Sequence, residues 1–297
     1  MAPPRTAPAA PPRPRSPALA VALPLLLLAA AAGLADAFTR PDQLAALNAY
    51  KDANINRSAS WRKTLSKWTC PTDPADSDQA CDPCSKDWSG NWEFIHCRGT
   101  NGPYGEGSTG DFNGLITNVH ITDQQLEGPV PREICYLQYL RELDLDGSNF
   151  NGPFPEFVFD CMPQLQELDL SYNRLTGMLP TSISSVTRLQ EFKVEYNEFM
   201  GPIPKAFADL ANLRVLRLEA NHLTGTVPPE LNRLSSRLNI LHLAHNQLKG
   251  ELTGLSNVRL MQVTTDNNAG LCGMVPAGIR FANGFNPYGT RLGQPCD

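Results

Sequence analysis

The clearest pattern along the chain is a set of three apolar positions, spaced i, i+3 and i+5, that returns every 24 or 25 residues. The six clear sets are Ile116, Val119 and Ile121; Leu140, Leu143 and Leu145; Leu165, Leu168 and Leu170; Leu189, Phe192 and Val194; Leu213, Leu216 and Leu218; and Leu238, Leu241 and Leu243. A weaker seventh set, Val258, Met261 and Val263, begins 20 residues after the sixth.

This pattern predicts a solenoid of stacked coils. Within each set, alternate side chains point inward from a short strand and the residues between them face solvent. One coil cannot bury its apolar side alone, so the coils must stack to build a continuous core. Asn173, Asn197, Asn221 and Asn246 recur where the chain leaves the strand, and an amide there can bond the backbone of neighbouring turns. Gln124, Ser148 and Asp266 replace this Asn in the first, second and seventh coils.

The sets continue into a longer repeat, L-x-x-L-x-L-x-x-N-x-L-x-G-x-I-P, which resembles the plant-type leucine-rich repeat. Trp68, Asp82-Pro83-Cys84, Trp88-Ser89-Gly90 and Cys97 resemble the N-terminal cap of such proteins, and Gly270-Leu271-Cys272-Gly273 resembles their closing segment. The resemblance covers about residues 38 to 297. It implies an α/β solenoid, the right-handed superhelix of leucine-rich repeats, with disulfide-stapled N- and C-terminal caps.

The first 37 residues have the pattern of a secretory leader. A basic start is followed by an apolar stretch from Ala18 to Leu34, and Ala35-Asp36-Ala37 has the small-x-small form of a signal-peptidase site. We therefore predict a signal peptide over 1–37 and a secreted, extracellular or cell-wall location. An uncleaved N-terminal anchor is the alternative, and it is disfavoured by Pro24 and by the short apolar stretch. We expect no membrane span further along the chain.

The remaining chain divides into an N-terminal cap over 38–97, a glycine-rich surface loop over 98–114, repeats over 115–268, and a C-terminal cap and tail over 269–297. In the cap, the spacing of Leu44, Leu47 and Tyr50 after Pro41 predicts a helix over residues 40–53. Asn56-Arg57-Ser58 is a sequon, which makes Asn56 a candidate for glycosylation.

Eight cysteines are an even number, and in a secreted chain we expect them to oxidise. Cys135 and Cys161 lie five and four residues before Leu140 and Leu165, at nearly the same point of adjacent coils. Coils about 4.8 Å apart bring two cysteines within bonding distance, so we predict this disulfide from geometry. Cys272 and Cys296 would then clasp the C-terminal tail.

The four cap cysteines, Cys70, Cys81, Cys84 and Cys97, allow three pairings from the sequence alone. The family resemblance implies that Cys84 pairs with Cys97, which leaves Cys70 with Cys81.

Composition and motifs exclude several classes of function. The net charge of −5 predicts no basic surface for nucleic acid. We expect no metal, because His242 and His245 are only two ligands and the calcium-like Asp144–Asn149 segment lacks its closing Glu. We expect no cofactor, and the absence of a nucleophile elbow, a zinc-protease motif and a kinase signature predicts no enzymatic activity.

The outward strand positions, on the face predicted to be concave, are rich in acids in the second to fourth coils. Two tyrosines align just past the strands of neighbouring coils. The candidate binding residues on this face are Glu142, Asp144, Asp146, Glu167, Asp169, Tyr172, Glu191, Lys193, Tyr196 and Arg217.

The sequence therefore favours a secreted or cell-wall recognition module that binds an extracellular protein, peptide or glycan through its concave face. It resembles plant receptor ectodomains and polygalacturonase inhibitors. The alternatives are a structural component of the extracellular matrix and a receptor-like protein held by an uncleaved N-terminal anchor. An ice-binding solenoid would need a regular Thr column, which the sequence lacks.

Overall fold

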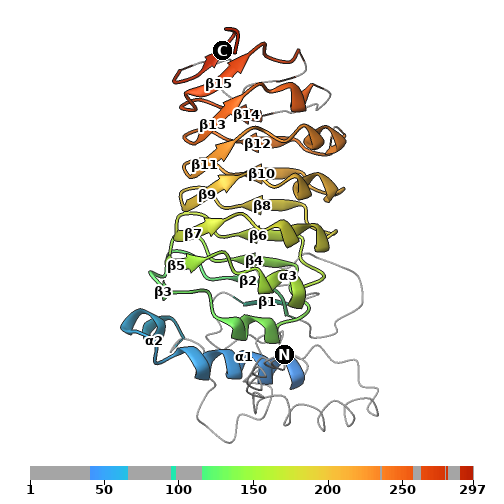
Figure 1. The fold of residues 1–297 in the computed structure, drawn as a ribbon. Helices are drawn as coiled ribbons and strands as arrows, with labels where there is room; N and C mark the ends of the chain where they lie inside the picture. Colours follow the sequence, from blue (N-terminus) through green and yellow to red (C-terminus); the bar gives the residue numbers. More distant parts are fainter. Residues whose placement is uncertain are drawn as a thin grey trace, which may run out of the picture. The chain divides into compact units, whose positions relative to one another are not determined.

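The computed structural model describes residues 41–65, 95–97, 116–234, 236–256, 262–277, 279 and 288–296. The repeats in this part of the chain stack one upon another, in sequence order (Figure 1). The predicted signal peptide, the glycine-rich loop and Cys70, Cys81 and Cys84 lie outside the described residues, as does the side chain of Cys97. The pairing of the four cap cysteines therefore stays a prediction.

Two eight-stranded sheets run along the stack. The first sheet contains, in spatial order, β1 (Ile95–Cys97), β2 (Ile116–His120), β4 (Glu142–Asp144), β6 (Glu167–Asp169), β8 (Glu191–Lys193), β10 (Val215–Arg217), β12 (Ile240–His242) and β14 (Gln262–Thr264). The second sheet contains β3 (Glu127–Gly128), β5 (Asn149–Pro153), β7 (Arg174–Met178), β9 (Glu198–Pro202), β11 (His222–Gly225), β13 (Gln247–Gly250), β15 (Gly270–Gly273) and β16 (Arg291–Leu292). We number the coils one to seven by their strand in the first sheet, from β2 to β14.

All neighbouring strands pair in parallel except β1, which pairs antiparallel with β2. Short helices close the coils: η4 (Arg132–Tyr136), α3 (Phe157–Cys161), η5 (Thr181–Ser185), η6 (Lys205–Asp209), η7 (Pro229–Leu234) and η8 (Thr253–Leu255). Pro131, Pro180 and Pro204 stand in extended conformation directly before three of them, because proline ends the ladder bonding and suits entry into a helix.

The predicted inward positions form the core. One inward residue of each strand is the register partner of the next across the first sheet, and each is at most 1% exposed. These residues are Leu143, Leu168, Phe192, Leu216, Leu241 and Val263. This register keeps every inward residue against another inward residue, since a slip of one position would turn the whole column outward. The predicted solenoid is therefore confirmed.

The Asn column joins each coil to the one before it. The Asn197 Oδ1 atom accepts a hydrogen bond from the Leu175 backbone N–H at 2.9 Å. Its Nδ2 atom donates to the Leu170 carbonyl oxygen at 2.9 Å and to the Val194 carbonyl oxygen at 3.2 Å. Asn173, Asn221 and Asn246 make equivalent bonds, so one buried amide satisfies backbone groups of two coils at each step from coil three to coil six.

The seventh coil corrects the sequence prediction. Val263 pairs with Leu241, so the coil follows the sixth after 22 residues in register, not 20. Asn268, not Asp266, occupies the Asn column, where it accepts from the Leu248 N–H at 3.0 Å and donates to the Leu243 carbonyl at 3.0 Å. The repeat spacing of Val258, Met261 and Val263 is therefore a coincidence. The hydrogen bonds of the Asn268 side-chain amide identify the register of coil seven against coil six.

Helices α1 (Pro41–Asn54) and α2 (Ala59–Leu65) cover the first coil, and the helix predicted over 40–53 is confirmed. Trp61 is fully buried, donates its Nε1–H to the Glu127 carbonyl at 2.8 Å and meets Phe150 edge-on at 5.9 Å between ring centroids.

Asn56 is exposed in the turn between the two helices, a position open to the predicted glycan.

Two predicted disulfides are present. Cys135 is bonded to Cys161 with Cα atoms 5.3 Å apart, and Cys272 is bonded to Cys296 with Cα atoms 5.2 Å apart. The first joins coils one and two, as coil stacking predicted, and the second ties the chain end to β15. Within the described ranges, no helix is long and apolar enough to cross a bilayer.

We predict that Asn197→Ala lowers the free energy of unfolding by about 2 to 4 kcal/mol, because it leaves several buried backbone groups without partners. Urea unfolding measures the loss. Asn212→Ala is the matched control, since Asn212 is exposed and its side chain donates to the Thr187 carbonyl at the surface; it should stay within about 0.5 kcal/mol of wild type. Equal losses in the two variants would show that the Asn column does not hold the coils together.

We predict that Cys272→Ser/Cys296→Ser costs about 2 to 5 kcal/mol and exceeds the cost of Cys135→Ser/Cys161→Ser. The two closed loops are similar, with sequence separations of 24 and 26 residues, but β14 is the edge strand of the first sheet and β15 is covered only by the two-residue strand β16. Hydrogen exchange should locate the opening at β14 and β15. A larger loss from the internal pair would contradict this account of the stack.

Candidate functional site

The ten predicted binding residues lie on one surface, the outer face of the first sheet and the residues just past its strand ends, which we call the strand face. Register places Glu142, Glu167 and Glu191 in one row across β4, β6 and β8. A second row contains Asp144, Asp169, Lys193 and Arg217. Three further residues lie two or three positions past the ends of β4, β6 and β8, namely Asp146, Tyr172 and Tyr196. The structure thus brings all ten together on coils two to five, although it does not test their role in binding.

Each cation on the strand face is already paired. The Lys193 Nζ atom lies 2.9 Å from Glu191 Oε2 and 3.7 Å from Asp169 Oδ2. The Arg217 Nη1 atom lies 3.4 Å from Glu195 Oε1. His120 Nε2 meets Glu142 Oε2 at 3.1 Å, and this hydrogen bond raises the pKa of His120.

Three acids of the strand face lack such a partner. Asp144, Asp146 and Glu167 have no cation within 4 Å among the described residues. Burial raises the pKa of Asp144, with Asp169 adding to the effect, and burial raises the pKa of Glu167, with Glu191 adding to it. Burial, followed by repulsion from Asp144 and Asp169, raises the pKa of Asp146 to about 6. Lys193 and His120 lower the pKa of Asp144 and Glu167 in part, but the net effect is a raised pKa for both, so the site holds negative charge that the fold offsets incompletely.

Tyr172 and Tyr196 form a stacked pair at the edge of the strand face. Their ring centroids are 4.5 Å apart with planes at 12°, and their side chains are 52% and 46% exposed. Both backbones are left-handed, with φ of 53° and 54°. The Tyr172 N–H donates to the Glu195 carbonyl at 2.9 Å, and the Tyr196 N–H donates to the Glu219 carbonyl at 3.1 Å. These bonds fix the turns, so the two rings project from a rigid base.

Glu195 is a site residue that the sequence did not single out from the other outward positions. It is only 5% exposed, and burial raises its pKa, while a hydrogen bond from the Ser171 hydroxyl acts in the opposite direction. The sequence places it on the strand face, but its burial follows from side chains on neighbouring coils, which the repeat pattern does not position.

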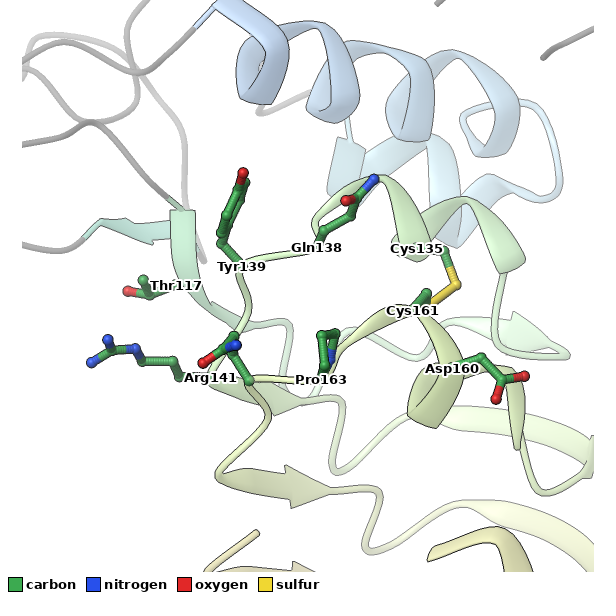
Figure 2. A pocket seen from close by; sticks show the side chains of 9 residues that line it. Thr117, Cys135, Gln138, Tyr139, Arg141, Asp160, Cys161 and Pro163 are labelled. Atoms are coloured by element: carbon green, nitrogen blue, oxygen red, sulfur yellow. A yellow bond between two sulfur atoms is a disulfide. The ribbon is translucent and has the colours of Figure 1, made fainter. Parts of the chain in front are cut away.

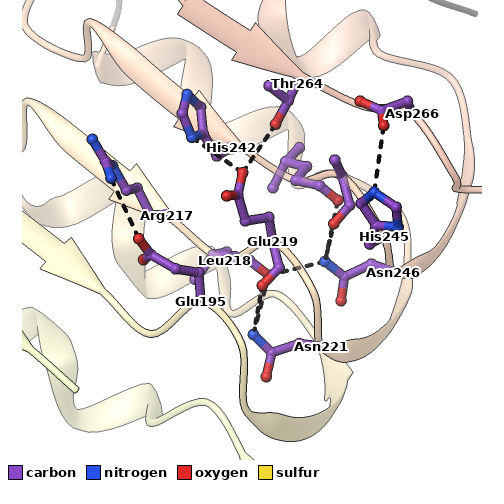
Figure 3. A network of polar contacts seen from close by, with 12 residues as sticks. Glu195, Arg217, Leu218, Glu219, Asn221, His242, His245, Asn246, Thr264 and Asp266 are labelled. Atoms are coloured by element: carbon purple, nitrogen blue, oxygen red, sulfur yellow. Dashed lines mark hydrogen bonds and ion pairs between the residues drawn. The ribbon is translucent and has the colours of Figure 1, made fainter. Parts of the chain in front are cut away.

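The histidines of coil six belong to separate ion pairs (Figure 3). His242 Nδ1 lies 3.1 Å from Glu219 Oε2, and this bond lowers the pKa of Glu219. His245 Nε2 lies 3.6 Å from Asp266 Oδ2 on coil seven. Among the residues described, no group of three or more His, Cys, Asp or Glu side chains is placed to hold a metal ion.

A hollow of about 610 Å³ lies on coils one and two, beside the Cys135–Cys161 disulfide (Figure 2). Arg141, Asp160, Gln138 and Gln164 are among its lining side chains, together with Tyr139. None of the ten predicted binding residues lines it, so it is a feature distinct from the strand face.

Comparison with known proteins shows leucine-rich repeats directly. Residues 138–199 match a family model described as "Leucine rich repeat", and residues 212–234 match a second model of the same description. Receptor-like protein 31 of Arabidopsis thaliana is 32% identical over 85 residues, which are 29% of this chain and 10% of that protein. Pollen receptor-like kinase 2 of Arabidopsis thaliana is 34% identical over 76 residues, 26% of this chain and 11% of that protein. The chain thus spans about a tenth of these relatives.

Solved structures show the same architecture over more of the chain. A Pollen Receptor Kinase 3 structure has a TM-score of 0.56 and 26% identity, and covers 79% of this chain and 98% of that one. The plant peptide hormone receptor RGFR1 in complex with RGF2 has a TM-score of 0.53 and 26% identity, and covers 68% of this chain and 32% of that one. The repeat pattern and the relatives agree: the chain is built of leucine-rich repeats, and over those repeats it is similar to plant receptor-like proteins and receptor kinases.

Proposed function

We propose that this protein is an extracellular recognition module, and that its strand face binds a peptide or protein that carries basic groups. Recognition, rather than catalysis, is the use to which a rigid repeat surface is suited. The predicted leader and the disulfides Cys135–Cys161 and Cys272–Cys296 support an oxidising, extracellular setting.

The observation that carries the proposal is the negative charge left on the strand face. Asp144, Asp146 and Glu167 lie in half-buried positions with raised pKa values, and among the described residues no cation lies within 4 Å of them. A cationic partner would relieve this repulsion, so part of its binding energy comes from strain already present in the free protein. The same charge would steer such a partner toward the face and repel acidic ones.

Tyr172 and Tyr196 would supply the contact energy. Rigid, half-exposed aromatic side chains lose little conformational entropy on binding and are enriched among the residues that dominate interfaces. Among the solved relatives, RGFR1 is described as a peptide hormone receptor in complex with RGF2. That description supports a peptide or protein ligand over the glycan that the sequence also allowed.

We predict that the double variant Tyr172→Ala/Tyr196→Ala binds the partner more weakly by about 2 kcal/mol or more, because both aromatic anchors are lost. This loss corresponds to a roughly thirtyfold increase in Kd. Glu142→Lys/Asp144→Lys/Asp169→Lys should slow association and flatten its salt dependence. The partner is first isolated by crosslinking the mature protein in an extracellular extract, and its binding to each variant is then measured by surface plasmon resonance.

Glu127→Lys/Glu198→Lys/Glu251→Lys is the matched control, since it reverses three exposed charges on or beside the second sheet. It should bind as wild type does. Unchanged affinity in both strand-face variants would move the site elsewhere on the molecule. If the protein instead binds large amounts of cell-wall material without saturation, the result would favour the alternative that it is a structural component of the extracellular matrix.

We predict that Asp146→Asn raises the free energy of unfolding at pH 7.5 by up to about 1 kcal/mol, allowing for solvent screening of this half-exposed group. The native state holds the Asp146 proton up to a pKa of about 6, whereas the unfolded chain releases it near the ordinary value of 3.8. Native stability therefore falls as pH rises through this window, and the Asn variant removes that loss.

Urea unfolding at pH 7.5 and at pH 4 measures the effect, and most of the difference between Asp146→Asn and wild type should vanish at pH 4. Asp160→Asn, an exposed change on α3, should show no such pH dependence. A variant that is less stable than wild type at pH 7.5 would mean that the fold stabilises the Asp146 carboxylate.

A further inference from the structure

The edge of the first sheet where its strands begin has a side-chain pattern unlike that of the strand face. From coil two to coil six, the residue directly before each strand donates its backbone N–H to a carbonyl one coil back, at 2.6–2.8 Å. This ladder links Thr117, Arg141, Gln166, Gln190, Arg214 and Asn239. The Gln190 Nε2 atom also donates to Gln166 Oε1 at 3.2 Å, so side chains follow one another along the stack as the backbones do.

A second row of side chains stands two residues earlier in each of these coils. A buried leucine separates the two rows, and all residues of both rows are exposed or half-exposed. Together the rows contain four arginines, five amides and one tyrosine, and no acid. The ten residues, which we call the arginine flank, are Tyr139, Arg141, Gln164, Gln166, Arg188, Gln190, Asn212, Arg214, Arg237 and Asn239.

The arginines of the flank have no acid partner. Among the described residues, no carboxylate oxygen lies within 4 Å of Arg141, Arg188, Arg214 or Arg237, whereas the cations of the strand face are all paired. Three of the four are exposed and belong to the successive coils four, five and six. Strand spacing sets such residues about 4.8 Å apart, so the flank presents guanidinium groups at regular intervals.

The hollow on coils one and two continues the flank at its N-terminal end. Arg141 and Gln164 of the flank line it, together with Thr117. Figure 2 shows Arg141 and Thr117 at one end of the hollow and Asp160 at the other, next to the disulfide. The end that joins the flank therefore offers a guanidinium and a hydroxyl group, and the acid lies at the far end.

The acids of the strand face form one border of the flank. Glu142, Glu167 and Glu191 each follow a flank residue directly, and their register places them in a row beside it. A positive and a negative stripe thus run side by side along the stack. A polyanion is attracted by the first stripe and repelled by the second, so the charge pattern confines it to the flank.

We propose that the arginine flank binds an acidic polysaccharide of the extracellular matrix, which runs along the stack from coil six to the hollow. Guanidinium groups pair with carboxylate and sulfate groups through parallel N–H donors. Amide side chains both donate and accept hydrogen bonds, as sugar hydroxyls do. An acidic peptide supplies carboxylates but few hydroxyls, and it leaves the five amides without matched partners. This inference goes beyond the proposed function, because it gives the protein a second ligand of opposite charge on a second surface.

The test is isothermal titration calorimetry of the mature protein with three polymers of one backbone, namely dextran, carboxymethyl dextran and dextran sulfate. We expect saturable binding of at least one acidic polymer and none of neutral dextran. A preference between the acidic polymers assigns the acid group as carboxylate or sulfate, and either preference supports the inference. A glutamate–alanine copolymer of matched charge density should bind at least about threefold more weakly than the tighter acidic dextran, because it lacks hydroxyls.

Arg188→Gln/Arg214→Gln/Arg237→Gln should weaken binding of the acidic dextran at least about tenfold, since three ion pairs are lost. Arg174→Gln/Lys205→Gln/Lys249→Gln is the matched control, because it removes three exposed charges from β7, η6 and β13. It should stay within about twofold of wild type. Circular dichroism of each variant before titration shows whether it is folded.

Gln166→Leu/Gln190→Leu tests the amides separately from the charges. It should weaken the acidic dextran by about threefold and leave the copolymer unchanged, since only the dextran offers hydroxyls to these side chains. Equal weakening of both polymers would mean that the amides do not recognise sugar hydroxyls, and it would overturn the polysaccharide as the ligand.

Equal losses in the flank and control triple variants would show attraction by overall charge and overturn the inference, as would the absence of binding by both acidic dextrans. A copolymer that binds as tightly as the dextrans would assign the flank to an acidic protein segment instead. Glu142→Lys/Asp144→Lys/Asp169→Lys should bind the acidic dextran at least as tightly as wild type, because it removes repulsion. The proposed function uses another partner and these strand-face variants, so either conclusion can fail while the other stands.

Discussion

From the third coil to the seventh, the chain leaves each strand through a turn whose backbone groups are shielded from water, and one asparagine amide satisfies them. The amide accepts from the preceding coil and donates to carbonyls of both coils, as Asn197 does. That bond ties each of these coils in register with the coil before it. A repeat protein depends on its nearest-neighbour interfaces, and here the polar part of the interface is as regular as the apolar part.

The fold could be predicted from the sequence because its information is periodic. Apolar triplets, Asn and Gly-x-x-Pro recur together, and each gives the same register as the others. The prediction failed at coil seven, where Val263 has two possible alignments and the apolar spacing favours the wrong one. Asn268 decides between them, since its three-carbonyl contact can form in only one register. Where periodicity weakened, the polar residue was the better guide.

The site was less predictable, because repetition determines which residues are neighbours but not how far each is buried. The rows of acids followed directly from the register. The burial of Glu195, the contact of the two tyrosine rings and the position of the Asp123 carboxylate over Gly147 depend on side-chain packing between coils. Burial raises the pKa values of Asp144 and Asp146, and parallel in-register stacking adds to the effect by placing like charges beside like charges.

The stacked pair of Tyr172 and Tyr196 bears on how such a surface can change over generations. Solenoids can lengthen or shorten by whole coils, and an inserted coil leaves every existing core contact intact except at the boundary it enters. A coil inserted beyond coil four leaves the two rings in contact. A coil that lacks an aromatic residue at this position, inserted between coils three and four, separates the rings by one further step and ends their contact. A duplicate of coil three or coil four supplies another tyrosine at the same position and lengthens the stack instead.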